Sequence, residues 1–117
     1  MKISSDYREF RTNEGWTPLI VAIHHKSERV VTRLLEEGCN PNSCGFKGTT
    51  PLMYAKTVFL EDVRLGWKFI KQLLEYGADA NRTDCFGRNL LYYVESVLPS
   101  DLATDLKDFL ENYDSIH

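Results

Sequence analysis

The sequence lacks the features that mark several large classes of protein. It has three cysteines in 117 residues, too few and too unevenly spaced for a disulfide-stapled secreted domain. No run approaches the roughly 18 apolar residues that span a membrane, and the first residues contain no apolar signal-peptide core. There is no basic excess, because 14 lysines and arginines face 17 acidic residues, which argues against a general nucleic-acid binder. We therefore expect one small, soluble, cytoplasmic domain with no membrane or nucleic-acid partner.

Motifs for catalysis and metal binding are missing as well. The chain has no Gly-rich phosphate loop, no Gly-x-Ser-x-Gly and no His-Glu-x-x-His. His24 and His25 with Cys39 and Cys44 match no zinc spacing, and Cys39 is expected to be a small buried residue. Cys44 and Cys85 are expected in turns, with no electropositive neighbour in sequence to activate a thiol. No catalytic residue, metal or cofactor is predicted, and a redox or metal-dependent enzyme is the weaker alternative.

What the chain does contain is an internal repeat. Residues 15–19 read Gly-Trp-Thr-Pro-Leu, and residues 48–52, 33 positions later, read Gly-Thr-Thr-Pro-Leu. Residues 34–42 match residues 73–81 at a spacing of 39, so six residues are inserted in the second copy. A third copy opens at residues 84–87. The chain is therefore a tandem array.

The local chemistry indicates that each unit contains two helices. Thr17 and Thr50 each precede a proline, which places a hydroxyl at the N-cap and proline at the first helical position. Ser27 is expected to cap a second helix. Gly38 and Gly77 stand where a left-handed residue would end that second helix. The unit is predicted to be turn–helix–helix.

Two other segments shape the array. Residues 40–48 and 79–87 are rich in Asn, Asp and Gly and predict projecting fingers of turns. The inserted residues are expected to lengthen a loop and the second helix of the middle unit. That helix carries an apolar stripe expected to lie in the core and to connect units, formed by Val63, Trp67, Ile70 and Leu74.

These features resemble the ankyrin repeat family. The residues that carry the resemblance are the two Gly-x-Thr-Pro-Leu-x-x-Ala boxes at 15–22 and 48–55, together with Gly77-Ala78-Asp79-Ala80-Asn81 and Asp84-x-x-Gly87. The resemblance implies an all-α solenoid of about three helix-turn-helix repeats, with projecting fingers and terminal caps. The expected division is a cap at 1–12 with Tyr7 and Phe10 over the first pair, then repeats at 13–45, 46–84 and 85–117. The second repeat includes the insertion, and the third includes an acidic C-terminal cap.

The sequence also departs from the family pattern. The histidine that usually follows Thr-Pro-Leu is replaced by Ile20, Met53 and Tyr92. Apolar packing is expected there in place of a hydrogen bond between units.

The resemblance further implies a binding surface. In this family, partners dock on the fingers and on the inner face of the first helices. The corresponding residues here are Glu14, Trp16, His24, His25, Phe46, Lys47, Thr49, Cys85, Phe86 and Arg88, with Asn13, Thr57, Val58 and Ser96 beside them. Phe46 and Phe86 are expected at matching fingertip positions, where each ring either binds a partner or folds back onto the adjacent finger. The same two alternatives apply to Tyr54, Tyr92 and Tyr93, for which a place in the core is favoured over partner binding.

The predicted function is non-enzymatic protein binding by a module that is a monomer on its own. Residues 48–56 are similar to those of small bacterial ankyrin proteins encoded beside toxins, which leads to the hypothesis of an immunity protein that binds and neutralises a cognate toxin. The alternative is a general adaptor or a fragment of a scaffold.

The distribution of charge leaves two interpretations open. Residues from Glu95 onward carry a net charge of -5, against +2 for residues 1–94. This acidic C-terminal unit is either a solvated cap or a surface that steers a basic partner toward the array.

Overall fold

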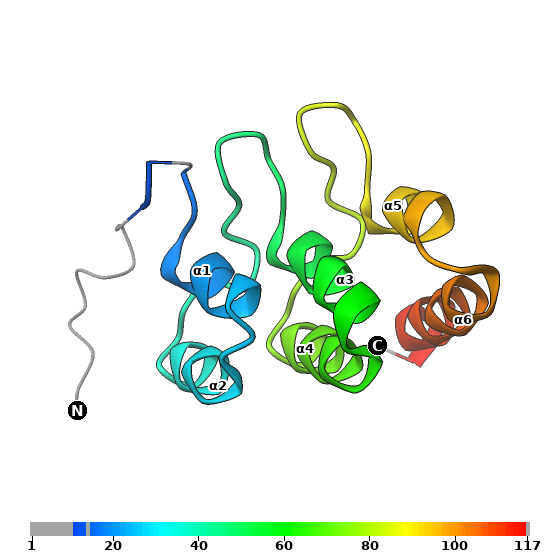
Figure 1. Cartoon of the computed structure of the whole chain (residues 1–117), viewed down its shortest axis with the longest axis horizontal. Coiled ribbons are helices and arrows are strands. Elements are labelled where there is room, and N and C mark those ends of the chain that lie inside the picture. The colour runs from blue at the N-terminus through cyan, green and yellow to red at the C-terminus, as the bar shows by residue number, and fades with distance from the viewer. Residues whose placement is uncertain (1–10, 14, 117) are drawn as a thin grey trace.

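The chain folds as three helix pairs arranged side by side. The computed structural model describes residues 11–13 and 15–116, without the side chains of 114–116. Within that part it contains six helices and no strand: α1 (Pro18–His24), α2 (Glu28–Glu36), α3 (Pro51–Glu61), α4 (Val63–Glu75), α5 (Leu90–Val97) and α6 (Ser100–Ile116). Loops project from the same side of the helices before α1, α3 and α5 (Figure 1). The predicted all-α solenoid with fingers is confirmed. Tyr7, Phe10 and Glu14 lie outside the described residues.

The first helix of each pair begins at a side-chain cap. The Thr17 hydroxyl accepts a hydrogen bond from the Ile20 amide at 3.3 Å, and Thr50 does the same for Met53 at 3.3 Å. Both predicted caps are confirmed. The cap predicted at Ser27 is wrong, because its side chain makes no capping bond. Its ψ is 84°, against 165° at Thr17, so Ser27 lacks the extended backbone in which a hydroxyl reaches the next turn.

The second helices of the first two pairs end at the predicted glycines. Gly38 and Gly77 have φ values of +89° and +98°, in the left-handed region. The amide that follows each glycine returns to the helix, with Cys39 donating to the Leu34 carbonyl at 3.0 Å and Ala78 to Leu73 at 2.9 Å. These bonds satisfy carbonyls that the helix end would otherwise leave open.

The inserted residues extend both helices of the middle pair, which corrects the prediction of a longer loop. α3 has 11 residues and α4 has 13, against seven in α1 and nine in α2. Asp62 alone separates α3 from α4, and its carboxylate accepts from the Leu65 amide at 3.1 Å. Because Asp62 both ends α3 and caps α4, the connection between them is one residue long, and the inserted residues lengthen the helices.

The apolar stripe of α4 lies in the core except at its first member. Ile70 and Leu74 are buried, whereas Val63 is exposed, so its assignment to the core is wrong. Val63 is the first residue of α4, next to the exposed Asp62 turn. Trp67 connects the middle pair to the last, because its ring centroid lies 5.2 Å from that of Phe59 in α3 and 5.4 Å from that of Phe109 in α6.

The apolar replacement of the family histidine is confirmed for two of its three positions. Ile20 and Met53 are buried, and the Met53 sulfur accepts a hydrogen bond from the Thr50 amide at 3.5 Å. Tyr92 is exposed, so the expected packing is wrong there. α1 packs on α3 and α3 packs on α5, but within the described residues no further first helix follows α5.

Candidate binding surface

Each finger ends in a turn of the same construction. The turns occupy residues 12–15, 45–48 and 84–87, and in each the last residue, a glycine, donates its amide to the carbonyl of the first at 2.9, 3.0 and 2.9 Å. Phe46 is the second residue of its turn, whereas Phe86 is the third of its own. The predicted match between the two rings is therefore wrong by one position. Lys47 is the residue that corresponds to Phe86.

The two fingertip rings are the most exposed large apolar side chains in the described part of the chain. Phe46 is 73% exposed and Phe86 is 64% exposed. The Phe46 ring also leans on the preceding finger, since a Cβ added to Gly15 would lie 2.4 Å from its Cγ. The Phe86 ring lies 5.4 Å from the guanidinium carbon of Arg88 in its own finger. Both rings keep most of their surface in water while having a defined contact.

A pocket lies at the base of the second finger. It has a volume of about 420 Å³ and is lined by Trp16, Gly45, Phe46, Lys47, Thr49 and Tyr54. We call it the finger pocket. The Trp16 ring lies 5.6 Å from that of Tyr54 and 4.8 Å from that of His24. Burial raises the pKa of the Tyr54 phenol. Thr49, which lines the pocket, stands at the position that Trp16 has in the first repeat and Arg88 has in the third.

A set of cations and aromatic rings continues this surface onto the third finger. The Arg88 guanidinium lies 4.9 Å from the Tyr92 ring, and the Lys56 ammonium lies 5.1 Å from the Tyr93 ring. Burial lowers the pKa of Lys56, which is half-buried. The two fingers are joined directly, because the Cys85 amide donates to the Lys47 carbonyl at 2.8 Å. We call the finger pocket together with Lys56, Phe86, Arg88, Tyr92 and Tyr93 the finger face.

Asp84 holds the third finger in place. Its carboxylate accepts the amides of Phe86 at 2.9 Å and Arg88 at 3.1 Å, as well as the Tyr93 hydroxyl. Burial alone would raise the pKa of Asp84, but these hydrogen bonds outweigh it and hold the pKa below its usual value. The same bond raises the pKa of Tyr93. The Asp84 carboxylate is therefore buried and engaged in positioning the third finger.

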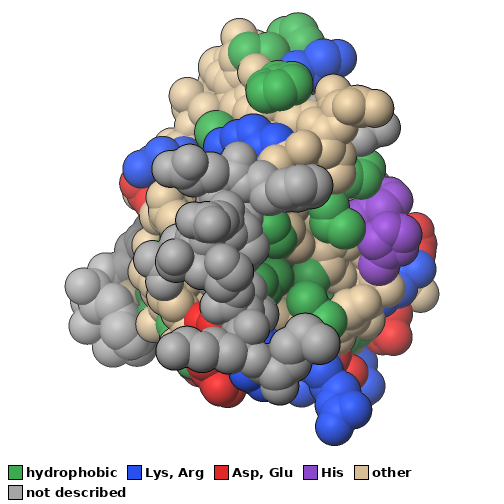
Figure 2. Space-filling view, turned by 90° about the vertical axis from the view of Figure 1, so that its left-hand side faces the viewer, with side chains coloured by type: hydrophobic (Ala, Val, Ile, Leu, Met, Phe, Trp, Pro, Cys, Tyr) green, Lys and Arg blue, Asp and Glu red, His purple; other side chains and the backbone are tan. Residues whose placement is uncertain are grey.

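The structure divides the other predicted binding residues. The His24 ring contacts that of Trp16, whereas His25 lines another hollow of about 420 Å³ at the N-terminal end, whose walls include Trp16, Val21 and Val30. Figure 2 views this end, and histidine side chains, drawn in purple, lie at its right-hand edge. Val58 is buried in the core, so its assignment to the surface is wrong, because it lies on the inward side of the lengthened α3.

The remaining predicted positions keep the exposure that the repeat implied. Cys85 is exposed, while Cys39 is buried as expected and Cys44 is half-buried. Thr57 and Ser96 are exposed, as is Asn13.

Sequence reasoning missed part of the finger face. Tyr92 is exposed and Tyr93 is half-buried over Lys56, so their assignment to the core is wrong; Tyr54 packs on the core but also lines the pocket. Lys56 carried no sequence signal of its own. The available signal was the repeat itself, since Tyr54 and Tyr93 occupy the same position 39 residues apart.

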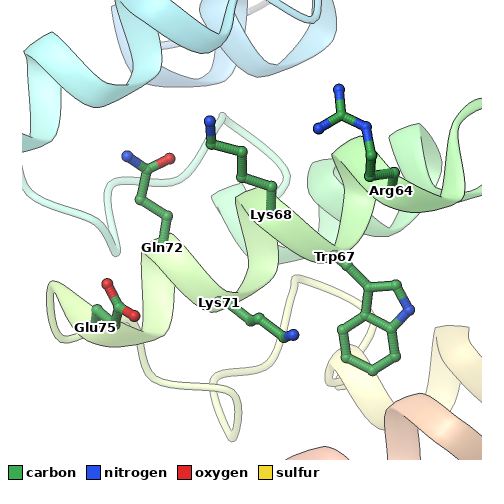
Figure 3. Close-up of a pocket in the computed structure, with 6 residues that line it drawn as sticks. All are labelled: Arg64, Trp67, Lys68, Lys71, Gln72 and Glu75. Carbon is green, nitrogen blue, oxygen red and sulfur yellow. The ribbon is translucent and has the colours of Figure 1, made fainter.

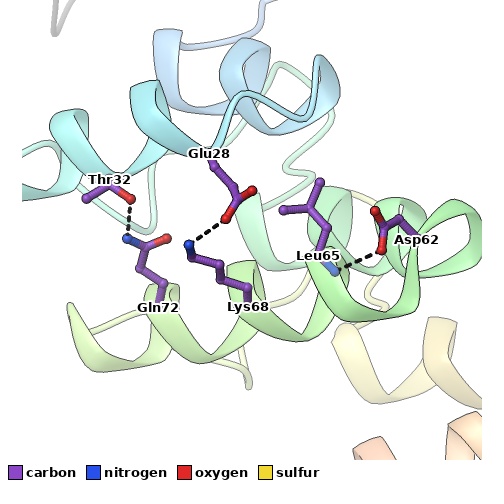
Figure 4. A network of polar contacts seen from close by, with 6 residues as sticks. All are labelled: Glu28, Thr32, Asp62, Leu65, Lys68 and Gln72. Atoms are coloured by element: carbon purple, nitrogen blue, oxygen red, sulfur yellow. Dashed lines mark hydrogen bonds and ion pairs between the residues drawn. The ribbon is translucent and has the colours of Figure 1, made fainter.

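A second hollow lies along α4, and its side chains mainly hold the helix pairs together. It has a volume of about 570 Å³ and is lined by Arg64, Trp67, Lys68, Lys71, Gln72 and Glu75 (Figure 3). Lys68 donates to Glu28 at 2.5 Å and Gln72 donates to Thr32 at 2.7 Å, which ties α4 to α2 (Figure 4). The bond from Lys68 lowers the pKa of Glu28. Lys68 and Gln72 of this hollow are thus already engaged within the array.

Residues 11–13 and 15–116 contain no group of three or more His, Cys, Asp or Glu side chains that could hold a metal ion. In the same part of the chain, no helix is both long enough and apolar enough to cross a membrane.

Comparisons with known proteins agree with this geometry. A family model described as ankyrin repeats (3 copies) matches residues 3–84. An ankyrin repeat protein of Fowlpox virus (strain NVSL) is 34% identical over 100 residues, which cover 85% of this chain and 48% of the viral protein. The crystal structure of the ankyrin repeat domain of Bcl-3, a unique member of the IkappaB protein family, matches with a TM-score of 0.63 and 26% identity. That match covers 82% of this chain and 38% of the other. The chain spans about half the length of the viral relative.

Proposed function

Because this chain belongs to the ankyrin repeat family, we propose that it binds a partner protein through the finger face. Ankyrin repeats are a non-enzymatic fold for protein–protein interaction. The observation that carries the choice of surface is the gathering of exposed aromatic rings and cations on the second and third fingers. The proposal involves no catalytic step, metal or cofactor.

Two physical arguments support this surface over the hollow along α4. Exposed aromatic and arginine side chains are the types that contribute most to binding when a partner removes them from water. Hydrogen bonds within and between the fingers also hold the face in one conformation, so little conformational entropy is lost on docking. In the α4 hollow, by contrast, Lys68 and Gln72 are already bonded to α2.

The test is capture of the partner from the native cell, followed by measurement of its affinity for two double variants. Phe46→Ala with Phe86→Ala removes the fingertip rings and should weaken binding at least thirtyfold, as loss of two hot-spot residues does. Val63→Ala with Tyr76→Ala is the matched control, because both side chains are exposed apolar groups away from the fingers. The control should bind within about twofold of the unmodified chain, as expected for residues outside an interface. Equal binding by a folded fingertip variant would show that the partner docks elsewhere.

A narrower form of the proposal names the partner as a cognate toxin, neutralised in the cytoplasm by a monomeric immunity protein. It rests on the resemblance of residues 48–56 to small bacterial ankyrin proteins encoded beside toxins. Co-expression with a toxin from the same genome should restore growth, and the fingertip variant should lose that protection. Absence of any toxin-like neighbour, together with several unrelated captured partners, would favour a general adaptor instead.

A further inference from the structure

The cations of the finger face gather beside aromatic rings and form no salt bridge with a described carboxylate. Lys26, Arg33, Lys68 and Lys107 each form a salt bridge with a glutamate. Among the described residues, Lys47, Lys56 and Arg88 form none. Asp84, whose charge acts on Arg88, is buried and occupied by its own hydrogen bonds. The finger face is therefore a positive surface on a chain of net charge -3.

Lys56 shows why this arrangement favours an anionic partner. Its ammonium is half-buried over the Tyr93 ring, so it has already lost part of its hydration. A ring face compensates for only part of that loss. A carboxylate brought by a partner would meet a cation that costs less to desolvate than a fully exposed lysine. The contact therefore favours carboxylates and disfavours basic segments.

The finger pocket adds an apolar requirement beside the charges. Its walls include the Trp16, Phe46 and Tyr54 rings, and its volume of about 420 Å³ accommodates one bulky side chain. The first and third repeats have Trp16 and Arg88 at the position of Thr49, so the second repeat has the smallest of the three side chains there. Lys47 lines the pocket, and Lys56 reaches from α3 to the Tyr93 ring of the third repeat.

We propose that the finger pocket receives one aromatic or large aliphatic side chain of an acidic, extended partner segment, whose carboxylates pair with Lys47, Lys56 and Arg88. This inference rests on the proposed function and specifies the chemical class of its partner. A single-stranded nucleic acid could also stack on rings and pair with cations, but the three cations are few for a phosphate backbone and the chain as a whole is acidic. A peptide segment is therefore the partner that the charges favour.

The experiment measures fluorescence anisotropy of labelled twelve-residue peptides with the full chain. The first peptide has a central Phe between flanks of Glu and Ser. Three others replace the central Phe by Ala, the Glu residues by Lys, or the Glu residues by Gln, and a labelled twelve-nucleotide dT strand completes the set. The acidic Phe peptide should bind, and each of the other probes should bind at least tenfold more weakly. Raising NaCl from 0.05 to 0.5 M should weaken the acidic peptide several-fold, because its ion pairs are near the surface.

Two pairs of variants test where the peptide lies. Thr49→Trp fills the pocket with the side chain that the first repeat already has at this position, and Thr104→Trp, at an exposed threonine of α6, is its control. Lys56→Met removes the half-buried cation, and Lys26→Met removes a cation that pairs with Glu61 elsewhere. Thr49→Trp and Lys56→Met should each weaken the acidic peptide at least fivefold, with both controls within twofold and all four variants folded by circular dichroism.

Several results would overturn the inference. They are equal binding of the acidic and basic peptides, equal or tighter binding of the dT strand, and binding indifferent to Thr49→Trp. If no peptide binds while capture of a whole partner still depends on Phe46 and Phe86, the acidic-segment inference fails and the proposed function stands. If capture is also indifferent to those rings, both fail.

Discussion

The close approach of the second and third fingers can be tested at a pair of equivalent glycines. Gly48 and Gly87 end their turns with φ values of +77° and +74°, so alanine is strained at either position. A Cβ on Gly48 would lie 3.0 Å from the Asp84 Cα and 3.1 Å from the Cys85 nitrogen, both backbone atoms of the next finger. A Cβ on Gly87 would meet nothing within 4 Å. Gly48→Ala and Gly87→Ala therefore share the conformational strain and differ in the clash.

The magnitudes follow from these two contributions. A left-handed backbone costs an alanine about 1–2 kcal/mol, and both variants should lose that much stability. Gly48→Ala must also push the fingers apart, which weakens the Cys85–Lys47 hydrogen bond, worth about 0.5–1.5 kcal/mol net. We expect Gly48→Ala to be the less stable of the two by about 1 kcal/mol.

Urea unfolding, followed by the fluorescence of Trp16 and Trp67, measures the difference. With a slope of about 2 kcal/mol per molar urea, the Gly48→Ala midpoint should fall about 0.5 M below that of Gly87→Ala. Gly48→Ala should also weaken partner binding, since it displaces the fingers that carry the binding residues. Equal urea midpoints for the two variants would mean that the second and third fingers pack less closely than the distances at Gly48 indicate.

Three further predictions concern other parts of the array. Trp67→Ala should lower the free energy of unfolding by about 2 kcal/mol in urea denaturation, roughly half the cost of a fully buried aromatic, because the ring links α3 to α6; an unchanged midpoint would contradict that link. Thr17→Ala should lower the free energy of unfolding by about 1 kcal/mol, and Ser27→Ala should change it by less than about 0.5 kcal/mol, because of these two side chains only that of Thr17 makes a capping hydrogen bond. Equal losses would contradict this assignment. Asp84→Asn should be less stable at neutral pH, and its deficit should shrink below about pH 4, where a carboxylate whose folded pKa is lowered loses its contribution. Urea midpoints at several pH values measure that deficit, and a constant deficit would contradict the role given to the Asp84 charge.

The parts of the fold that the sequence predicted are those in which local chemistry repeats. Thr17 and Thr50 each precede a proline, and Gly38 and Gly77 each follow a Leu-Leu-Glu segment. The signal for each helix boundary therefore occurs twice in the sequence. A hydroxyl cap or a left-handed glycine acts within one turn of chain, and its effect can be read without knowledge of distant residues. Ser27 is a residue type that commonly caps helices, but its surrounding sequence is not repeated in the second unit, and its side chain makes no capping hydrogen bond.

The missed parts depend on contacts between segments far apart in sequence. Spacing alone counted six inserted residues but could not show that Asp62 would both end α3 and cap α4. The place of Lys56 depends on a contact across the repeats, because its ammonium lies over the Tyr93 ring of the third repeat. Whether a cation is paired is decided by its neighbours in space, which the repeat pattern does not reveal.

The acidic C-terminal unit and the positive finger face make opposite demands on a partner. Asp101, Asp105 and Asp108 are exposed on α6. Their negative electrostatic field would attract a basic molecule and repel an acidic one. If the partner docks an acidic segment on the fingers, converting these three residues to asparagine should leave its association rate unchanged or raise it. Stopped-flow measurements at low salt would detect either change, because steering acts mainly on association. A several-fold slower association would instead mean that α6 steers a basic partner and does more than cap the array.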